Sequence, residues 1–166
     1  MTVRIPYRLK SGNLTKGHIV DHEIMDRLIH AHLSAEDTGD LDAAVAVYTD
    51  DVEHDVVGAP GGPLHGPAAA RDRYAGLLQN VRTDRMTELR RYYAERACIV
   101  EHECTATVIG QFGGLPGLDR AVTFRLLHVF EFRDGLISRE NVWMDAATVS
   151  AQLAPPPAAV GVPAPG

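Results

Sequence analysis

The hydrophobic positions follow a helical period in the first half of the chain and a period of two in the second half. Residues 18–36 and 40–48 carry apolar side chains three and four positions apart, which predicts two amphipathic helices, the second capped by Asp40. Gly66-Pro67 opens a third helical stretch, because proline fits the first turn of a helix. The short alternating stretch 52–57 lies between the second and third helices and is predicted to be a strand.

Alternating apolar and polar positions after residue 85 predict long strands. The expected strands cover residues 86–93, 96–110, 121–133 and 136–146. Asp134-Gly135 separates the last two, and this dipeptide is a strong signal for a two-residue hairpin turn. Such a turn opposes Arg133 to Leu136 and, further along, His128 to Asn141. Helices first and strands last predict a single α+β domain.

The expected register gives the hairpin one face that combines apolar and polar side chains. Its members are Phe124, Leu126, His128, Phe130, Phe132, Ile137, Arg139, Asn141, Trp143 and Asp145. An unpaired polar group buried in a core costs roughly 1–3 kcal/mol, so polar groups are unusual on a purely structural face. An apolar wall with a few convergent polar groups is typical of a ligand pocket. A shift of one residue would reverse the assignment of faces.

Length, composition and charge narrow the classes of protein. The chain has 166 residues, of which 45% are hydrophobic and 23% charged, as in an ordinary soluble domain. Its net charge of −6 argues against binding to nucleic acid or to an anionic membrane surface. No apolar run is long enough to span a bilayer and no secretory leader is evident, so we expect a cytoplasmic protein. We expect an arm over residues 1–17, the domain over 18–153, and a Pro/Ala/Gly-rich disordered tail over 154–166.

Three stretches of the sequence carry a family resemblance. They are YTDDVEHDVVG with the following HGPAAARDRYAGLL, then IGQFGGLPGLDRAVTF, then LLHVFEFRDGLISRENVWMD. The chain resembles the SnoaL-like, polyketide cyclase-related branch of the nuclear transport factor 2-like superfamily. The resemblance implies a cone-shaped fold in which three N-terminal helices pack on a curved, mainly antiparallel sheet that encloses a pocket. It also implies a homodimer formed through the outer face of the sheet.

The sequence departs from the family pattern at positions that matter for chemistry. SnoaL-like cyclases have an acid/base aspartate seven residues before the hairpin glycine, where this chain has His128. A family histidine is replaced by Val108, and a common tryptophan by Asn141, with Trp143 two residues further on. Asp145 keeps the aspartate at the end of the last strand. The resemblance therefore implies the fold more directly than the cyclase mechanism.

Four titratable residues are the catalytic candidates: His128, His102, Asp145 and His54. An imidazole with a pKa of about 6.5 suits proton transfer at neutral pH, and His128 stands where the family has its acid/base group. His102 is on the inner face of the neighbouring strand, and His54 is on the short strand that lines the cavity floor in this fold. Asp145 is expected to orient a histidine or act as a base, with capping of the following segment as the alternative. For His128 the alternative is a core histidine bonded to Asn141.

Six residues are predicted to contact a ligand: Tyr48, Tyr74, Asn141, Trp143, Phe124 and Arg139. Tyrosine hydroxyls donate hydrogen bonds to substrate oxygens and an indole stacks on flat ligands, although core packing is the alternative for these aromatic residues. The candidate ligands His54, His102 and His128 are not spaced as HxH, HxxxH or HExxH, so we expect no metal and no cofactor. Cys98 and Cys104 lie six residues apart on one strand, too far for a disulfide.

These features predict a cofactor-independent enzyme that acts by general acid–base catalysis on a small, largely apolar carbonyl or polycyclic molecule. Cyclisation, isomerisation and dehydration all fit a proton transfer next to a carbonyl. One alternative is a non-catalytic module that binds a small molecule, which the missing aspartate at position 128 favours. A second alternative is an epoxide hydrolase. In this fold that activity uses an Asp-Arg-Asp arrangement, for which only Asp145 and Arg139 are available here.

Overall fold

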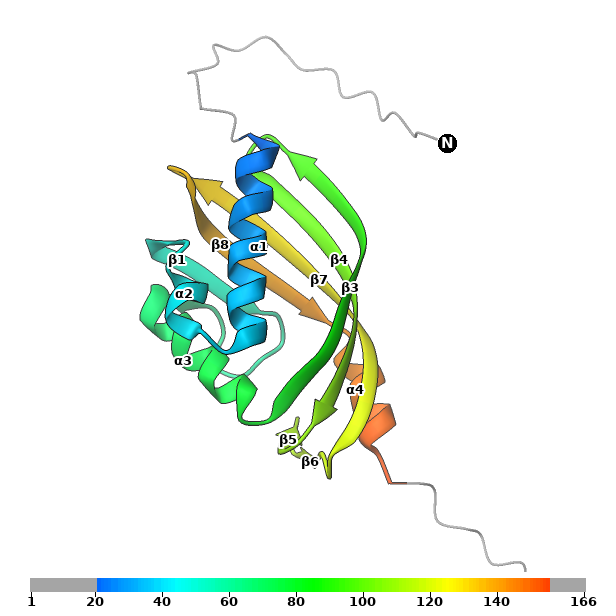
Figure 1. The fold of residues 1–166 in the computed structure, drawn as a ribbon. Coiled ribbons are helices and arrows are strands. Elements are labelled where there is room, and N and C mark those ends of the chain that lie inside the picture. The colour runs from blue at the N-terminus through cyan, green and yellow to red at the C-terminus, as the bar shows by residue number, and fades with distance from the viewer. Residues whose placement is uncertain (1–20, 156–166) are drawn as a thin grey trace, which may run out of the picture.

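Three helices precede the long strands and a fourth follows them (Figure 1). The computed structural model describes residues 21–155; the predicted arm 1–17, and the predicted tail apart from residues 154–155, lie outside the described residues. The helices are α1 (His22–Thr38), α2 (Leu41–Val45), α3 (Pro67–Leu78) and α4 (Ala146–Leu153). The α+β class is confirmed. The three N-terminal helices were predicted, and α4 was not.

Six strands in the described part of the chain form one curved sheet. Their spatial order is β2 (Leu64–His65), β1 (Tyr48–Val56), β8 (Leu136–Met144), β7 (Arg120–Arg133), β4 (Ala97–Val108) and β3 (Val81–Ala94). The β1–β8 pair is parallel and the other neighbours are antiparallel. A small hairpin, β5 (Gln111–Phe112) and β6 (Leu115–Pro116), lies apart from this sheet. In Figure 1, α1, α2 and α3 lie on one side of the sheet, and α4 lies near the start of β7 and the end of β8.

Capping signals in the sequence set where the first helices begin and end. The Asp21 carboxylate accepts a hydrogen bond from the Glu23 N–H at the start of α1. Gly39, with φ 76°, ends α1 because the left-handed conformation favours glycine. Asp40 caps α2 through the Ala43 N–H, as predicted.

The second helix is shorter than the sequence predicts. It ends at Val45, and Tyr48 begins β1, so the prediction of a helix through residue 48 was wrong. The Val47 carbonyl accepts a hydrogen bond from the Ile137 N–H of β8, which draws this segment into the sheet. Pairing with β8 thus prevails over the helical spacing of the apolar residues, since local propensity is easily overridden by tertiary contacts.

The predicted two-residue turn joins β7 to β8. Asp134 and Gly135 have φ angles of 53° and 77°, the left-handed pair that a type I′ turn requires. Arg133 opposes Leu136, as predicted. The turn therefore fixes the first pairs of the hairpin as the sequence indicates.

A β-bulge changes the register beyond those first pairs. Ser138 has no opposing residue on β7, and from there Glu131 opposes Arg139 and His128 opposes Val142. The predicted pairing of His128 with Asn141 was therefore wrong. One extra residue reverses the two faces of β8, because side chains alternate with a period of two.

The bulge changes which residues of β8 face inward. Beyond it, Arg139, Asn141 and Trp143 share the outer face, and Glu140, Val142 and Met144 share the inner face with the even-numbered residues of β7. The prediction that the first three line the pocket was wrong. Glu140 becomes the one charged residue on the inner face of β8.

The residues displaced from the inner face have contacts of their own. The Arg139 guanidinium pairs with Glu53 at 2.7 Å and Glu131 at 3.1 Å. The Asn141 amide donates to Asp55 at 3.0 Å. Asp145 begins α4, and its carboxylate accepts the Thr148 N–H at 3.0 Å, which holds the pKa of Asp145 below its usual value. For Asp145 the alternative of a capping role was the correct one.

Candidate functional site

A belt of buried polar side chains crosses the inner face of the sheet between two apolar clusters. One cluster packs under α1 and contains Met25 and Phe130; the other packs under α4 and contains Leu126 and Leu153. The polar residues between them come from four strands: His54, His102, His128 and Glu140. All four have side chains at most 5% exposed, so each must find its partners inside the protein.

Glu140 is the centre of this belt. Its Oε2 accepts hydrogen bonds from the Tyr74 hydroxyl at 2.7 Å and from the Tyr48 hydroxyl. The His32 Nε2 lies 3.4 Å from the same oxygen. His128 Nε2 lies 3.6 Å from Oε1. One carboxylate thus contacts two phenols and two imidazoles, with the His54 ring 4.0 Å away as a third.

The arrangement makes His32 and Glu140 a buried ion pair. Burial disfavours the charged imidazole, but the Glu140 carboxylate outweighs burial and raises the pKa of His32 to about 9. Burial likewise disfavours the carboxylate, but His32, His128 and His54 together hold the pKa of Glu140 well below its usual range. The His32 Nδ1 lies 3.0 Å from the Ala44 carbonyl, to which it donates when charged. At neutral pH this pair carries one positive and one negative charge.

His128 remains uncharged although it also contacts Glu140. Burial, helped by the neighbouring His102, His32 and His54, lowers the pKa of His128 to about 4 despite the opposing effect of Glu140. Burial also lowers the pKa of His54 and of His102. These three imidazoles are therefore neutral at pH 7, each with one nitrogen able to accept a proton.

Several ring nitrogens of these histidines have no hydrogen-bond partner within residues 21–155. They are Nδ1 of His128, Nδ1 of His102 and both nitrogens of His54. Most buried polar atoms in folded proteins are paired, so these unpaired nitrogens are unusual and make the three histidines candidates for a functional role.

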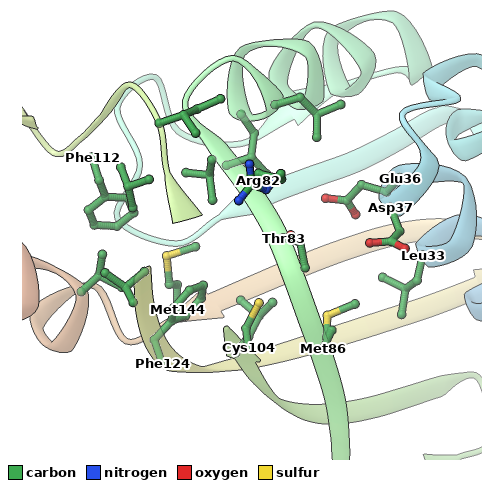
Figure 2. Close-up of a pocket in the computed structure, with 18 of the residues that line it drawn as sticks. Leu33, Glu36, Asp37, Arg82, Thr83, Met86, Cys104, Phe112, Phe124 and Met144 are labelled. Carbon is green, nitrogen blue, oxygen red and sulfur yellow. The ribbon is translucent and has the colours of Figure 1, made fainter. Parts of the chain in front are cut away.

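Two adjoining cavities open onto the belt. The larger has a volume of about 690 Å³ and is lined by His54, Tyr74 and Glu140 among others. The smaller has a volume of about 310 Å³ and a largely apolar lining. Figure 2 shows this smaller cavity, with Met86, Cys104, Phe124 and Met144 along it and Glu36 and Asp37 near the end of α1. His128 lines both cavities and so lies where they meet.

The predicted site residues fall into three groups. His128, His54, Tyr74 and Phe124 line the cavities. His102 and Tyr48 lie behind that lining: the His102 ring packs edge-on against His128 with centroids 5.6 Å apart, and Tyr48 binds Glu140. Asp145, Asn141, Trp143 and Arg139 line neither cavity.

Three residues of the site were not among the candidates from the sequence: Glu140, His32 and Glu36. Glu140 was assigned to the outer face because nothing in the sequence signals the bulge at Ser138. His32 did carry a signal, since it follows Met25 and Ile29 at helical spacing and continues the buried stripe of α1. Glu36 lies one turn further and lines both cavities; burial raises its pKa to about 7 despite His32, whose Nε2 is 3.8 Å away.

Residues 21–155 contain no evident metal site and no helix suited to span a membrane. No group of three or more His, Cys, Asp or Glu side chains has an arrangement that would hold a metal ion. No helix there is long and apolar enough to cross a membrane. The absence of a cofactor and the cytoplasmic location both stay predictions.

Comparison with known protein families identifies the domain. The family model of the SnoaL-like domain matches residues 29–140, which is more than half of the chain. The chain belongs to the SnoaL-like family. Among curated proteins, no sequence matches this SnoaL-like chain.

Solved structures share the fold of this SnoaL-like protein at low sequence identity. A proposed polyketide cyclase from Xanthomonas campestris is 20% identical with a TM-score of 0.68, covering 80% of this chain and 98% of its own. An LEH-like epoxide hydrolase from M. tuberculosis is 21% identical with a TM-score of 0.61, covering 79% and 90%. A proposed isomerase from Bacillus subtilis is 18% identical with a TM-score of 0.67, covering 79% and 93%. These likenesses concern the fold alone.

Proposed function

We propose that this SnoaL-like protein is a cofactor-independent enzyme of the isomerase or cyclase type, which moves a proton next to the carbonyl of a small, largely apolar molecule. One observation carries the proposal: His128 is a buried, neutral imidazole at the meeting point of the two cavities, and its Nδ1 has no partner among the described residues. Because this imidazole is already neutral at pH 7, it can accept a proton from a substrate without first releasing one to solvent.

In the proposed step, His128 Nδ1 takes a proton from the carbon next to the substrate carbonyl. The electron pair of the C–H bond moves into the carbonyl, giving an enolate, and His128 becomes an imidazolium. Its Nε2–H faces Glu140 Oε1 at 3.6 Å, so the carboxylate stabilises the new positive charge. His54 is neutral and its ring nitrogens are unpaired, so it is suited to donate a hydrogen bond to the enolate oxygen. Return of the proton to a different carbon of a conjugated enolate completes an isomerisation. Attack of the enolate on a second carbonyl of the substrate, whose new alkoxide then takes the proton from His128, completes a cyclisation.

The two cavities support a largely apolar substrate. The smaller one is walled by Val108, Val122, Phe124 and Val149, which favour a hydrocarbon portion. The smaller cavity also has Glu36, Asp37, Arg82 and Thr83 in its lining, and the larger one holds His54, Tyr74 and Glu140. The alternative of a non-catalytic binding module uses the same cavities and is an outcome of the experiment below. The epoxide hydrolase alternative rested on Asp145 and Arg139, which lie outside both cavities.

Proton exchange into a small bicyclic ketone tests the proposed function directly. The wild-type protein, incubated with 2-tetralone in D₂O buffer, is expected to speed α-deuterium incorporation, measured by NMR. Because the base form of His128 predominates above a pH of about 4, the rate should rise through pH 4 and be level from pH 5 to 8. The variant His65→Gln, which removes an exposed histidine, should match the wild type. Binding of 2-tetralone without any acceleration over an equal concentration of free imidazole would favour the binding module instead.

We further propose that a second copy of the chain covers the outer face of the sheet. Tyr92 opposes Ile99, which opposes Val129, and Leu127 opposes Trp143 on the next strand, so these five residues form one apolar patch. Tyr92 is 55% and Trp143 53% exposed, which is unusual for such large side chains. Sedimentation velocity should give a dimer for the wild type and a monomer for Trp143→Glu. A monomeric wild type would refute this proposal.

A further inference from the structure

Arg73 stands apart from the other arginines of the described chain. Four other arginines are half-buried, and each has an acceptor: Arg71 pairs with Asp42, Arg91 with Asp26, Arg139 with Glu53, and Arg120 binds the Leu153 carbonyl. Arg73 is also half-buried, yet its guanidinium has no hydrogen bond or ion pair with another residue of 21–155. A cavity-lining guanidinium that has no acceptor in the described part of the protein can bind an anionic group of a ligand.

The position of Arg73 places this unpaired charge at the proposed site. Arg73 lines the larger cavity, together with His54 and Tyr74. It precedes Tyr74 on α3, and the Tyr74 ring packs edge-on against His54 with centroids 5.0 Å apart. The positive charge of Arg73 is one reason, after burial, why the pKa of His54 is lowered, so the two groups are close enough to interact.

The carboxyl groups of the larger cavity do not cancel the charge of Arg73. Glu140 is paired with His32. Glu36 has a pKa of about 7 because of burial, so it is partly protonated at neutral pH. Asp72 is exposed and forms no ion pair with its neighbour. Arg73 is therefore available to an anion that enters the cavity.

We propose that the substrate is an apolar keto acid, whose carboxylate binds to Arg73 while its carbonyl lies between His54 and His128. The planar guanidinium forms two parallel hydrogen bonds with a carboxylate, which gives orientation as well as affinity. The hydrocarbon part fills the smaller cavity beyond His128. This inference rests on the proposed function for the carbonyl, and it adds the anionic group that the proposed function leaves open.

Binding of a matched pair of probes tests this inference without requiring catalysis. 2-Naphthylacetate and 2-naphthylacetamide have nearly the same shape and differ in charge. Calorimetry at pH 7.5 should show that the wild type binds the acid at least tenfold more tightly than the amide. Arg73→Met should remove that preference, Arg73→Lys should retain part of it, and Arg85→Met, which changes an exposed arginine of β3, should leave it intact.

Equal binding of the two probes to the wild type, no binding of either, or an unchanged preference in Arg73→Met would each overturn the inference. These outcomes are separate from those of the exchange experiment, because 2-tetralone carries no charge. A wild type that prefers the acid but does not exchange protons of 2-tetralone would refute the proposed function and leave the anion site standing. A wild type that exchanges protons of 2-tetralone but shows no preference for the acid would refute the anion site and leave the proposed function standing.

Discussion

Replacing His128 by glutamine is expected to slow α-deuterium incorporation into 2-tetralone by roughly 10²–10⁴-fold, the usual contribution of a positioned general base. Glutamine has a similar length and polarity, but it cannot accept a proton at neutral pH. The cavities and the Glu140–His32 pair should persist, because His128 contributes no hydrogen bond within the described residues that another side chain needs. NMR exchange rates at pH 7, measured with saturating and limiting ketone, separate lost turnover from lost binding.

His102→Gln is the matched control for that experiment. His102 is also a buried, neutral histidine of the polar belt, and it packs against His128. It lines neither cavity, so its replacement should reduce the rate far less than replacement of His128. An equal loss of exchange rate in both variants would mean that the polar belt affects the rate only through its packing. A full rate in His128→Gln would remove His128 as the base.

Glu140→Gln is expected to destabilise the protein by roughly 3–5 kcal/mol, because removing one partner of a buried ion pair leaves the other charge uncompensated. The glutamine oxygen can still accept from Tyr48 and Tyr74, but it offers His32 no negative charge. His32 must then lose its proton in the folded state. Urea unfolding at pH 6 measures this loss. Glu103→Gln on the outer face, a residue with no ion pair among residues 21–155, should stay within about 0.5 kcal/mol of the wild type.

The cost of Glu140→Gln should depend on pH in a defined direction. The folded-state pKa of His32 is raised, from about 6.5 to about 9, so its stabilising effect is complete below pH 6.5 and is lost as the pH rises to 9. The pKa of Glu140 is lowered, so its contribution is present above pH 4.5 and is lost as the pH falls. The free energy of unfolding of the wild type should therefore exceed that of the variant by the largest amount between pH 4.5 and 6.5. A difference of less than 1 kcal/mol at pH 6, or one that grows toward pH 9, would contradict the ion pair.

Much of the fold was predictable because it depends on local signals. The α1 stripe, Asp40 as a cap, Pro67 at the start of α3, and the Asp134-Gly135 turn each specify their own segment. Alternation along β4 and β7 gave the correct inner face for both strands, which placed His102 and His128. These predictions needed no knowledge of distant contacts.

The site was predictable only in part, because it depends on a bulge. A turn sets the register of the pairs beside it, but a single extra residue at Ser138 reverses every later assignment on β8. The predicted register therefore placed Arg139, Asn141 and Trp143 on the inner face, where the structure has Glu140, Val142 and Met144. The sequence contains no signal for this bulge that would distinguish Ser138 from any other polar strand residue.

The partners of His128 were hidden for a related reason. His32 and Glu140 are more than 100 residues apart in the sequence, and their pairing follows from how α1 packs on the sheet. A histidine in an apolar helical stripe and a glutamate on a strand each look ordinary alone. Their chemistry, one charged imidazole and one neutral imidazole around one carboxylate, arises only from burial and proximity.

The most direct test of this electrostatic arrangement is a pH titration of the histidine ring nitrogens by NMR in ¹⁵N-labelled protein. His32 should remain charged through pH 8 and lose its proton near pH 9, whereas His128 should stay neutral down to pH 5 and gain a proton near pH 4. In Glu140→Gln, His32 should become neutral at pH 7. Titration of both histidines together near pH 6.5 in the wild type would contradict a neutral base held beside a buried ion pair.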